Sequence, residues 1–211
     1  MPILEQLGVA VGLASIAGVN LYLTVLITGL LVRFDLLHLA DKYHDMEVLG
    51  HPWVLGVAGV MFLLEFVADK VPWLDSFWDG VHTFIRPIGG ALLGMQALGS
   101  LPPHMQVIAG LLAGGAALTT HTAKAGARLV INHSPEPASN IAMSVAEDCA
   151  VTGGSALIFL HPAIALGVFS VILVLLWILL PRLFRLLGKF FQGLKRRWHS
   201  LRGQQTPTGG T

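Results

Sequence analysis

Residues 63–79 read LLEFVADKVPWLDSFWD, where an apolar helix runs directly into five ionisable residues, a proline and two tryptophans. Glu65 and Asp69 are four residues apart, so on a helix their carboxylates share one face, one turn apart. The following proline lacks a backbone N–H donor, and two more acids repeat the four-residue spacing beyond it, Asp75 and Asp79. Charged groups at the end of an apolar helix are costly in a membrane and usually functional. The stretch therefore predicts a polar site inside an otherwise apolar helical protein.

The overall composition is that of a membrane protein. Hydrophobic residues make up 54% of the 211 positions and charged residues only 12%, and the mean hydropathy is +0.71. A soluble domain carries about twice that charged fraction. A helix needs roughly 20 residues to cross the bilayer, so the chain has room for about six transmembrane helices in one bundle. We predict an all-α integral membrane protein with no second globular domain.

The apolar stretches divide the chain into three parts. We predict a transmembrane domain over residues 1–181, a basic amphipathic helix at the membrane surface over 182–202, and a disordered tail over 203–211. The first residues lack the basic start and cleavage site of a secretory signal, so the first apolar stretch is expected to remain as a helix. The six spans are expected at about 7–32, 53–69, 87–101, 105–127, 149–160 and 163–180.

Two isolated residues within these spans carry specific expectations. Asn20 lies near the middle of the first span, where an amide needs a hydrogen-bond partner across a helix interface or, alternatively, contacts a ligand. Cys149 is the only cysteine, which excludes an internal disulfide and a thiolate metal site. We expect no cofactor, and the identity of any bound metal stays open.

Charge is distributed unevenly along the chain. The formal net charge is +1, yet no Asp or Glu follows Asp148, whereas seven of the 13 Lys and Arg do. The positive-inside rule then places the C-terminus in the cytoplasm of a bacterial inner membrane, and six spans would place the N-terminus there too. The basic helix is expected to contact anionic lipid headgroups, at about 1 kcal/mol per basic residue, rather than nucleic acid. Whether the chain forms homo-oligomers stays open.

A weak internal repeat relates the two middle parts of the chain. ADK at 68–70 closes the second span as TAK at 122–124 closes the fourth, and IGGALL at 88–93 is echoed by TGGSAL at 152–157. Two spans in each copy would make the copies parallel, related by an axis along the membrane normal. That arrangement brings the charged ends of the second and fourth spans together. The candidate transport or ion-binding residues are Glu65, Asp69, Lys70, Asp75, Asp79, His121, Lys124, Arg128, Glu147 and Asp148.

Several motifs together resemble a known family. These are AGVNLYLT at 17–24, the opening stretch at 63–79, HTFIRP at 82–87, HTAKAGAR at 121–128, and later Asn, Ser and Glu-Asp positions. The combination is similar to a widespread bacterial membrane protein family known only as a domain of unknown function, over about residues 5 to 185. The resemblance implies a polytopic membrane architecture and leaves the activity open.

A looser similarity is to the duplicated cation/proton antiporters, whose motif is Glu, an apolar residue, Gly, Asp, then Lys or Arg. Here the Glu65–Asp69 spacing is one residue too long, Ala68 stands at the glycine position, and no second copy is present near Lys124. The similarity therefore serves only as an analogy for how such carboxylates work.

Three classes of function are compatible with these residues. A small secondary transporter of a cation or solute would use the carboxylates to exchange a proton or bind a hard cation. An intramembrane enzyme acting on a lipid phosphate would use the Lys and Arg side chains to hold phosphate, with Asp75 and Asp79 as metal ligands, but the sequence shows no nucleophile motif. A non-catalytic scaffold or lipid-handling protein would use the charges only to pin helix ends. We expect a transporter rather than an enzyme.

Overall fold

The computed structural model describes residues 3–36, 43–99, 101–131 and 137–203, and within these ranges every regular element is a helix. The predicted tail from residue 204 onward lies outside the described residues. In chain order the elements are α1 (Ile3–Ala17), α2 (Leu21–Arg33), the short 3-10 helix η2 (His44–Gly50), α4 (Pro52–Ala68), α5 (Pro72–Ala97), α6 (Pro103–Ile131), α7 (Pro137–Leu160) and α8 (Pro162–Gly203).

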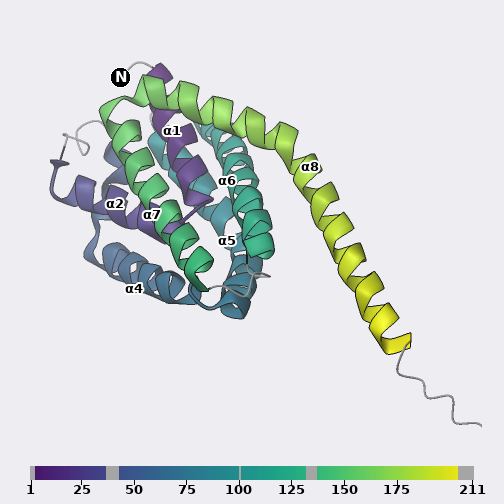
Figure 1. Ribbon diagram of the computed structural model, residues 1–211. Coiled ribbons are helices and arrows are strands. Elements are labelled where there is room, and N and C mark those ends of the chain that lie inside the picture. Colours follow the sequence, from purple (N-terminus) through teal and green to yellow (C-terminus); the bar gives the residue numbers. More distant parts are fainter. Residues whose placement is uncertain (1–2, 37–42, 100, 132–136, 204–211) are drawn as a thin grey trace, which may run out of the picture.

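The predicted first span, residues 7–32, is not one helix. α1 ends at Ala17, and α2 begins at Leu21 in a new direction (Figure 1). Asn20 lies in the extended region and its side-chain oxygen accepts a hydrogen bond from Leu23 N at 3.0 Å, so it caps the N-terminus of α2. The apolar pattern alone places Asn20 within a helix. Asn20 instead begins a new helix, because an Asn side chain competes with the helical backbone for hydrogen bonds.

The predicted loop between the second and third spans is also different. Only Asp69, Lys70 and Val71 separate α4 from α5, and α5 then continues through Pro87 to Ala97. Pro72 begins this helix, where its missing N–H costs nothing. Most of the stretch between the two predicted spans, residues 70–86, is therefore the first half of a long helix, and Asp75, Asp79 and Arg86 lie on it.

The basic C-terminal region is continuous with the last apolar helix. α8 runs through Pro181 to Gly203, so the predicted separation into a span and a distinct helix at 182–202 is not seen. Its first part packs on α1, and its remainder leaves the bundle (Figure 1). The contact of the basic residues with anionic lipid stays a prediction.

Two helices of the described chain are long and apolar enough to cross a membrane, Ala138–Leu160 and Pro162–Arg185. A third span is added if η2 and α4, which meet at 61°, count as one bent span. α1 and α2 are apolar but shorter. The structure thus supports a membrane-associated helical protein, and six spans are not confirmed.

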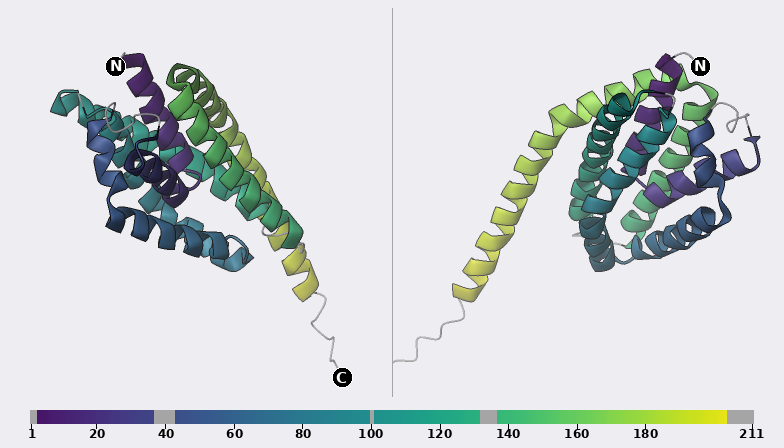
Figure 2. Two further views of the ribbon diagram at one scale, coloured as in Figure 1. Left: turned by 90° about the vertical axis from the view of Figure 1, so that its left-hand side faces the viewer. Right: turned by 180° about the vertical axis from the view of Figure 1, so that it is seen from behind.

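The bundle is built around α1, which contacts α5, α6, α7 and α8 and is buried along most of its length. Figures 1 and 2 show the N-terminal end of α1 beside the start of α8. Gly8 permits this approach, because a Cβ there would overlap the backbone of Pro162. At the other end of α1, a Cβ on Gly18 would overlap Thr120 and Ala117 of α6. Small residues thus let the central helix lie against its neighbours.

Gly90 on α5 provides a test of this packing. A Cβ there would overlap the Cβ of Ala117, whereas nothing lies within 4 Å of a Cβ on Gly115, which is exposed on α6. We expect Gly90→Ala to lower the free energy of unfolding by about 1–3 kcal/mol through overpacking. Gly115→Ala is the matched control and should be neutral or stabilising by about 0.5–1 kcal/mol through helix propensity. Thermal unfolding in detergent measures both, and equal effects would contradict the packing.

Candidate functional site

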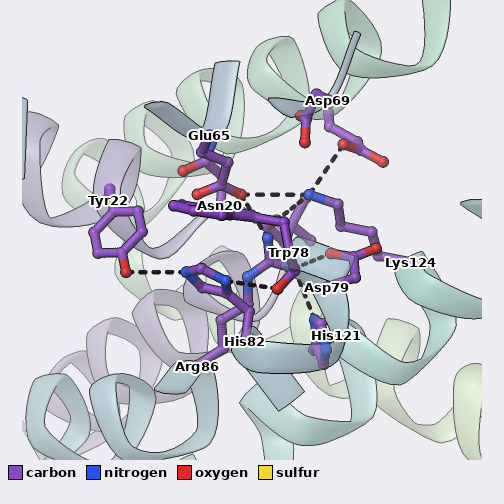
Figure 3. A network of polar contacts seen from close by, with 12 residues as sticks. Asn20, Tyr22, Glu65, Asp69, Trp78, Asp79, His82, Arg86, His121 and Lys124 are labelled. Atoms are coloured by element: carbon purple, nitrogen blue, oxygen red, sulfur yellow. Dashed lines mark hydrogen bonds and ion pairs between the residues drawn. The ribbon is translucent and has the colours of Figure 1, made fainter. Parts of the chain in front are cut away.

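A cluster of buried charged side chains forms where five segments meet. The end of α4, the middle of α5, the second half of α6, α7, and the break between α1 and α2 each contribute (Figure 3). Eight charged residues of the described chain are buried in it. The acids are Glu65, Asp69, Asp75, Asp79 and Glu147, and the bases are Arg86, Lys124 and Arg128.

Arg86 is the most highly connected residue of this buried charge cluster. Both Arg86 and Glu65 have no exposed surface, and Arg86 Nη2 donates to Glu65 Oε1 at 2.5 Å. Arg86 Nη1 lies 3.4 Å from both Asp79 Oδ1 and the carbonyl oxygen of Gly18. The guanidinium fork thereby connects α4, α5 and the end of α1, which a point charge such as Lys would do less well.

The contact between Arg86 and His121 fixes the state of the imidazole. Arg86 Nη1 lies 2.7 Å from His121 Nδ1, and a guanidinium can only donate, so Nδ1 accepts and His121 is neutral. Its proton is then on Nε2, which is 3.1 Å from Thr83 Oγ1. The Thr83 hydroxyl in turn donates to the backbone oxygen of Asp79 at 3.0 Å. A chain of hydrogen bonds therefore joins Arg86 to the backbone of Asp79.

Lys124 connects the cluster to the broken helix. Its Nζ donates to the carbonyl oxygen of Val19 at 3.0 Å and lies 3.5 Å from Glu65 Oε1 and 3.2 Å from Glu147 Oε2. The carbonyl groups of Gly18 and Val19 are freed by the end of α1, where the helix dipole favours positive charge. The interruption of the helix thus provides oxygen ligands for two buried cations, Arg86 and Lys124.

Arg128 holds the second half of the cluster. It donates to Glu147 through Nε at 2.9 Å and Nη2 at 2.5 Å, a bidentate pair. Nη2 also donates to Asp69 Oδ2 at 3.2 Å, and Nη1 lies 3.5 Å from Asp75 Oδ1. Ser144 Oγ donates to the same Asp69 oxygen at 3.4 Å. Arg128 therefore ties α6 to α7, the end of α4 and the start of α5.

An aromatic group borders the cluster on the side of α2. The Tyr22 hydroxyl is 2.9 Å from His82 Nε2, and the ring of His82 stacks on Trp78 with centroids 4.9 Å apart. His82 Nδ1 is 2.8 Å from the carbonyl oxygen of Trp78 and donates to it, so Nε2 of a neutral ring accepts from Tyr22. This group closes the cluster against the apolar interior.

The buried charges do not balance. Five carboxylates face three permanent cations, a formal excess of two negative charges among these side chains, and the neutral His121 adds no positive charge. Two carboxylate oxygens, Glu65 Oε2 and Asp79 Oδ2, are buried without a hydrogen-bond partner among the residues that the structure describes. Uncompensated buried carboxylates are expensive. The cluster therefore has an intrinsic capacity to take up positive charge.

A cavity of about 200 Å³ reaches the cluster between α5 and α6. Asp79 and Arg128 line it, together with the hydroxyl side chains of Ser76 and Thr83. A polar cavity of this size is large enough to hold water. Asp79 is thus the acid that combines a weak ion pair, an unpartnered oxygen and access to a polar cavity.

The chain matches one known protein family over most of its length. The model of one family, described as domain of unknown function DUF4126, matches residues 7–182. The chain belongs to this family. No curated protein and no solved structure matches the chain. The resemblance expected from the sequence motifs is confirmed, and the DUF4126 assignment leaves the activity to be inferred from the site.

The structure brings together nearly all candidate residues expected in this DUF4126 chain. Asp148 is half-buried at the margin, where its Oδ1 accepts from Asn20 Nδ2 at 3.1 Å. Lys70 is the exception. Its Nζ donates to the Phe66 carbonyl at 2.9 Å and lies over the Phe66 ring, and it forms no ion pair with the described acids of the cluster. Within the described ranges, no group of three or more His, Cys, Asp or Glu side chains is arranged to hold a metal ion.

Sequence reasoning missed the centre of the cluster. Arg86 is not among the candidate residues predicted from the sequence, and the predicted third span begins directly after it, at residue 87. Tyr22 and His82 carried no spacing signal, since they are 60 residues apart. Only the four-residue spacing from Trp78 to His82 to Arg86 indicated that these residues share a helix face.

The Glu65–Arg86 pair gives a stability test. We expect Glu65→Gln and Arg86→Met each to cost about 3–5 kcal/mol, because each leaves the other charge buried and uncompensated. The double variant should cost less than the sum of the single variants. Lys70→Met is the matched control, and outside the cluster it should change stability by less than about 0.5 kcal/mol. Additive losses, measured by chemical or thermal unfolding, would show that the two side chains are not coupled.

Proposed function

We propose that this protein is a small proton-coupled secondary transporter of a cation or small solute, and that Asp79 is the residue that gains and loses the proton. The single observation that carries the proposal is the buried acidic excess, with Asp79 holding one oxygen without a partner. A proton taken up there removes one of the two surplus charges. Buried ionisable groups in membrane helices are a common means of coupling proton movement to transport.

Asp79 suits this role better than Glu65 does. Glu65 accepts from Arg86 at 2.5 Å and lies 3.5 Å from Lys124, so two cations compensate its negative charge. Asp79 has one ion pair at 3.4 Å, and its cationic partner is already compensated by Glu65. The cavity lined by Asp79 and Arg128 offers a route for water and protons. Asp79 then changes charge, while three neighbouring side chains keep their charges and positions: Glu65, Arg86 and Lys124.

The broken helix supports the same proposal. Transporters commonly place their sites where a membrane helix is interrupted, so that freed carbonyl oxygens and helix ends meet the transported species. Here the carbonyls of Gly18 and Val19 contact Arg86 and Lys124. An enzyme acting on lipid phosphate would need those cations for its substrate, yet Arg86, Lys124 and Arg128 each contact at least one carboxylate. These residues therefore fit a transporter better than an enzyme that acts on lipid phosphate.

We further propose that α1 and α2 form a re-entrant pair that enters and leaves from one side of the membrane. Gly8 lies against Pro162 at the start of α8, and Arg33 at the end of α2 donates to the Gly50 carbonyl at 3.1 Å. The chain would then cross five times, through the bent η2–α4 pair, α5, α6, α7 and α8. The basic C-terminus would remain cytoplasmic and the N-terminus would lie outside, unlike the six-span expectation.

Asp79→Asn tests the proposed proton site. The variant should lose proton movement into proteoliposomes with an entrapped pH-sensitive dye when a sodium or potassium gradient is imposed. Its melting temperature should stay close to that of the unmodified protein, since the amide keeps the shape and the lost ion pair is long. Infrared difference spectra across a pH titration should also lose the band of a protonated carboxyl group.

Glu47→Gln is the matched control, because Glu47 is exposed and pairs with His44 away from the cluster. It should keep the flux and the infrared band. Undiminished proton flux in folded Asp79→Asn would remove Asp79 from the mechanism. Absence of any flux in the unmodified protein under all imposed gradients would overturn the transporter proposal and favour the scaffold alternative.

Cysteine labelling tests the proposed topology. In a Cys149→Ser background, single cysteines at Leu4, His104 and Val130, all exposed, are probed with a membrane-impermeant reagent. Positions 4 and 104 should react from one side and position 130 from the other. The six-span arrangement predicts instead that positions 4 and 130 react from the same side, which would disprove the re-entrant pair.

A further inference from the structure

A second cavity, of about 480 Å³, lies between α2, α4 and α5 and takes no part in the charge cluster. Its walls are apolar side chains such as Val25, Ala58 and Leu93, and the only polar side chains among its lining residues are Tyr22 and Gln96. The volume is typical of a site for a small ligand. A cavity with such walls does not hold water stably.

The lining residues that face outward are also apolar. Trp53, Val57 and Leu92 line the cavity and are 79%, 61% and 54% exposed. All three lie on α4 and α5, which cross the membrane in the five-span arrangement proposed above, and in that arrangement the opening faces the hydrocarbon of the bilayer rather than water. The molecules available at that opening are lipid tails.

We propose that this cavity binds one acyl chain of a membrane lipid. Moving a tail from the bilayer into the cavity gains little from the hydrophobic effect, because both surroundings are apolar. The gain comes from van der Waals contacts with the walls that α2, α4 and α5 provide around the chain. A straight chain fits better than a compact ligand, because the lining positions extend along α5 from Gln96 to Gly89, two helical turns or about 10 Å.

Trp53 and Gln96 set the orientation of the lipid. Trp53 and Gln96 lie at one end, and tryptophan favours the level of the headgroups. The Gln96 amide oxygen is buried and has no hydrogen-bond partner in the described part of the chain, so a lipid with a donor on its headgroup satisfies it. The tail then runs toward Gly89 and Tyr22, whose hydroxyl contacts His82. The bound chain ends against the aromatic group that borders the charge cluster.

The test uses a phosphatidylethanolamine probe with a photoreactive diazirine at the end of its acyl chain. The full-length protein is reconstituted in phosphatidylcholine nanodiscs with the probe, irradiated and digested, and the labelled peptides are identified by mass spectrometry. We expect saturable labelling of one probe per chain near Tyr22 and Gly89, and its loss on addition of excess unlabelled phosphatidylethanolamine. Labelling that is not saturable, or is spread over the exposed helix faces, would mean surrounding bilayer lipid only and would overturn the proposal.

Ala58→Phe fills the cavity from α4, where Ala58 is 3% exposed, and should abolish this labelling. Val60→Phe is the matched control, since Val60 is 59% exposed on the same helix and outside the cavity lining. Should Ala58→Phe fail to fold, Val25→Phe fills the cavity from α2 and serves the same purpose. Full labelling of a folded cavity-filling variant would contradict the proposal. The result is independent of the proton flux, so this proposal and the transporter proposal can fail separately.

Discussion

The arrangement of this protein depends on the burial of Arg86 against Glu65. A guanidinium and a carboxylate with no exposed surface need further partners for the donors and acceptors that their own pair leaves over. Arg86 finds a carboxylate from α4, an imidazole from α6 and a carbonyl from the end of α1, and only its Nε and Glu65 Oε2 keep no partner among the described residues. Three helices must therefore converge on one residue of α5, and this requirement limits how the rest of the bundle can pack.

The same constraint explains the interrupted first helix. A continuous helix through Val19 and Asn20 would keep its carbonyl oxygens in its own hydrogen bonds. The carbonyl oxygen of Val19 would then not be available to Lys124. By ending at Ala17, α1 frees those oxygens, and Asn20 restarts the chain as the cap of α2 while its amide nitrogen reaches Asp148. The small residues at Gly18 and Ala17 permit the close approach to α6 that the contacts require.

The proposed proton site, Asp79, lies in a cluster in which most other carboxylates are more firmly held. Most of its carboxylates are held by two partners, as Glu147 is by Arg128 and Lys124. Asp79, beside the α5–α6 cavity, has instead one ion pair at 3.4 Å and one oxygen without a partner in the described part of the chain. A rigid frame with one weakly held ionisable group is the arrangement that proton-linked transport needs, because the frame keeps its geometry while that group changes charge.

The sequence by itself determined the class of the protein, its helical composition and nearly all charged residues of the candidate site, because hydropathy and the four-residue spacing of acids are local properties. It also placed the ends of the second and fourth spans together, through the echo of ADK and TAK. Only the tertiary structure decided that Lys70 stays outside the cluster, that Arg86 is its centre and that α1 breaks before Asn20. Those outcomes depend on contacts between polar groups that lie far apart in the sequence. Asn20 and its partner Asp148, for example, are separated by 128 residues. A local pattern shows that a buried amide or guanidinium needs partners, but only the packed helices decide which partners it has.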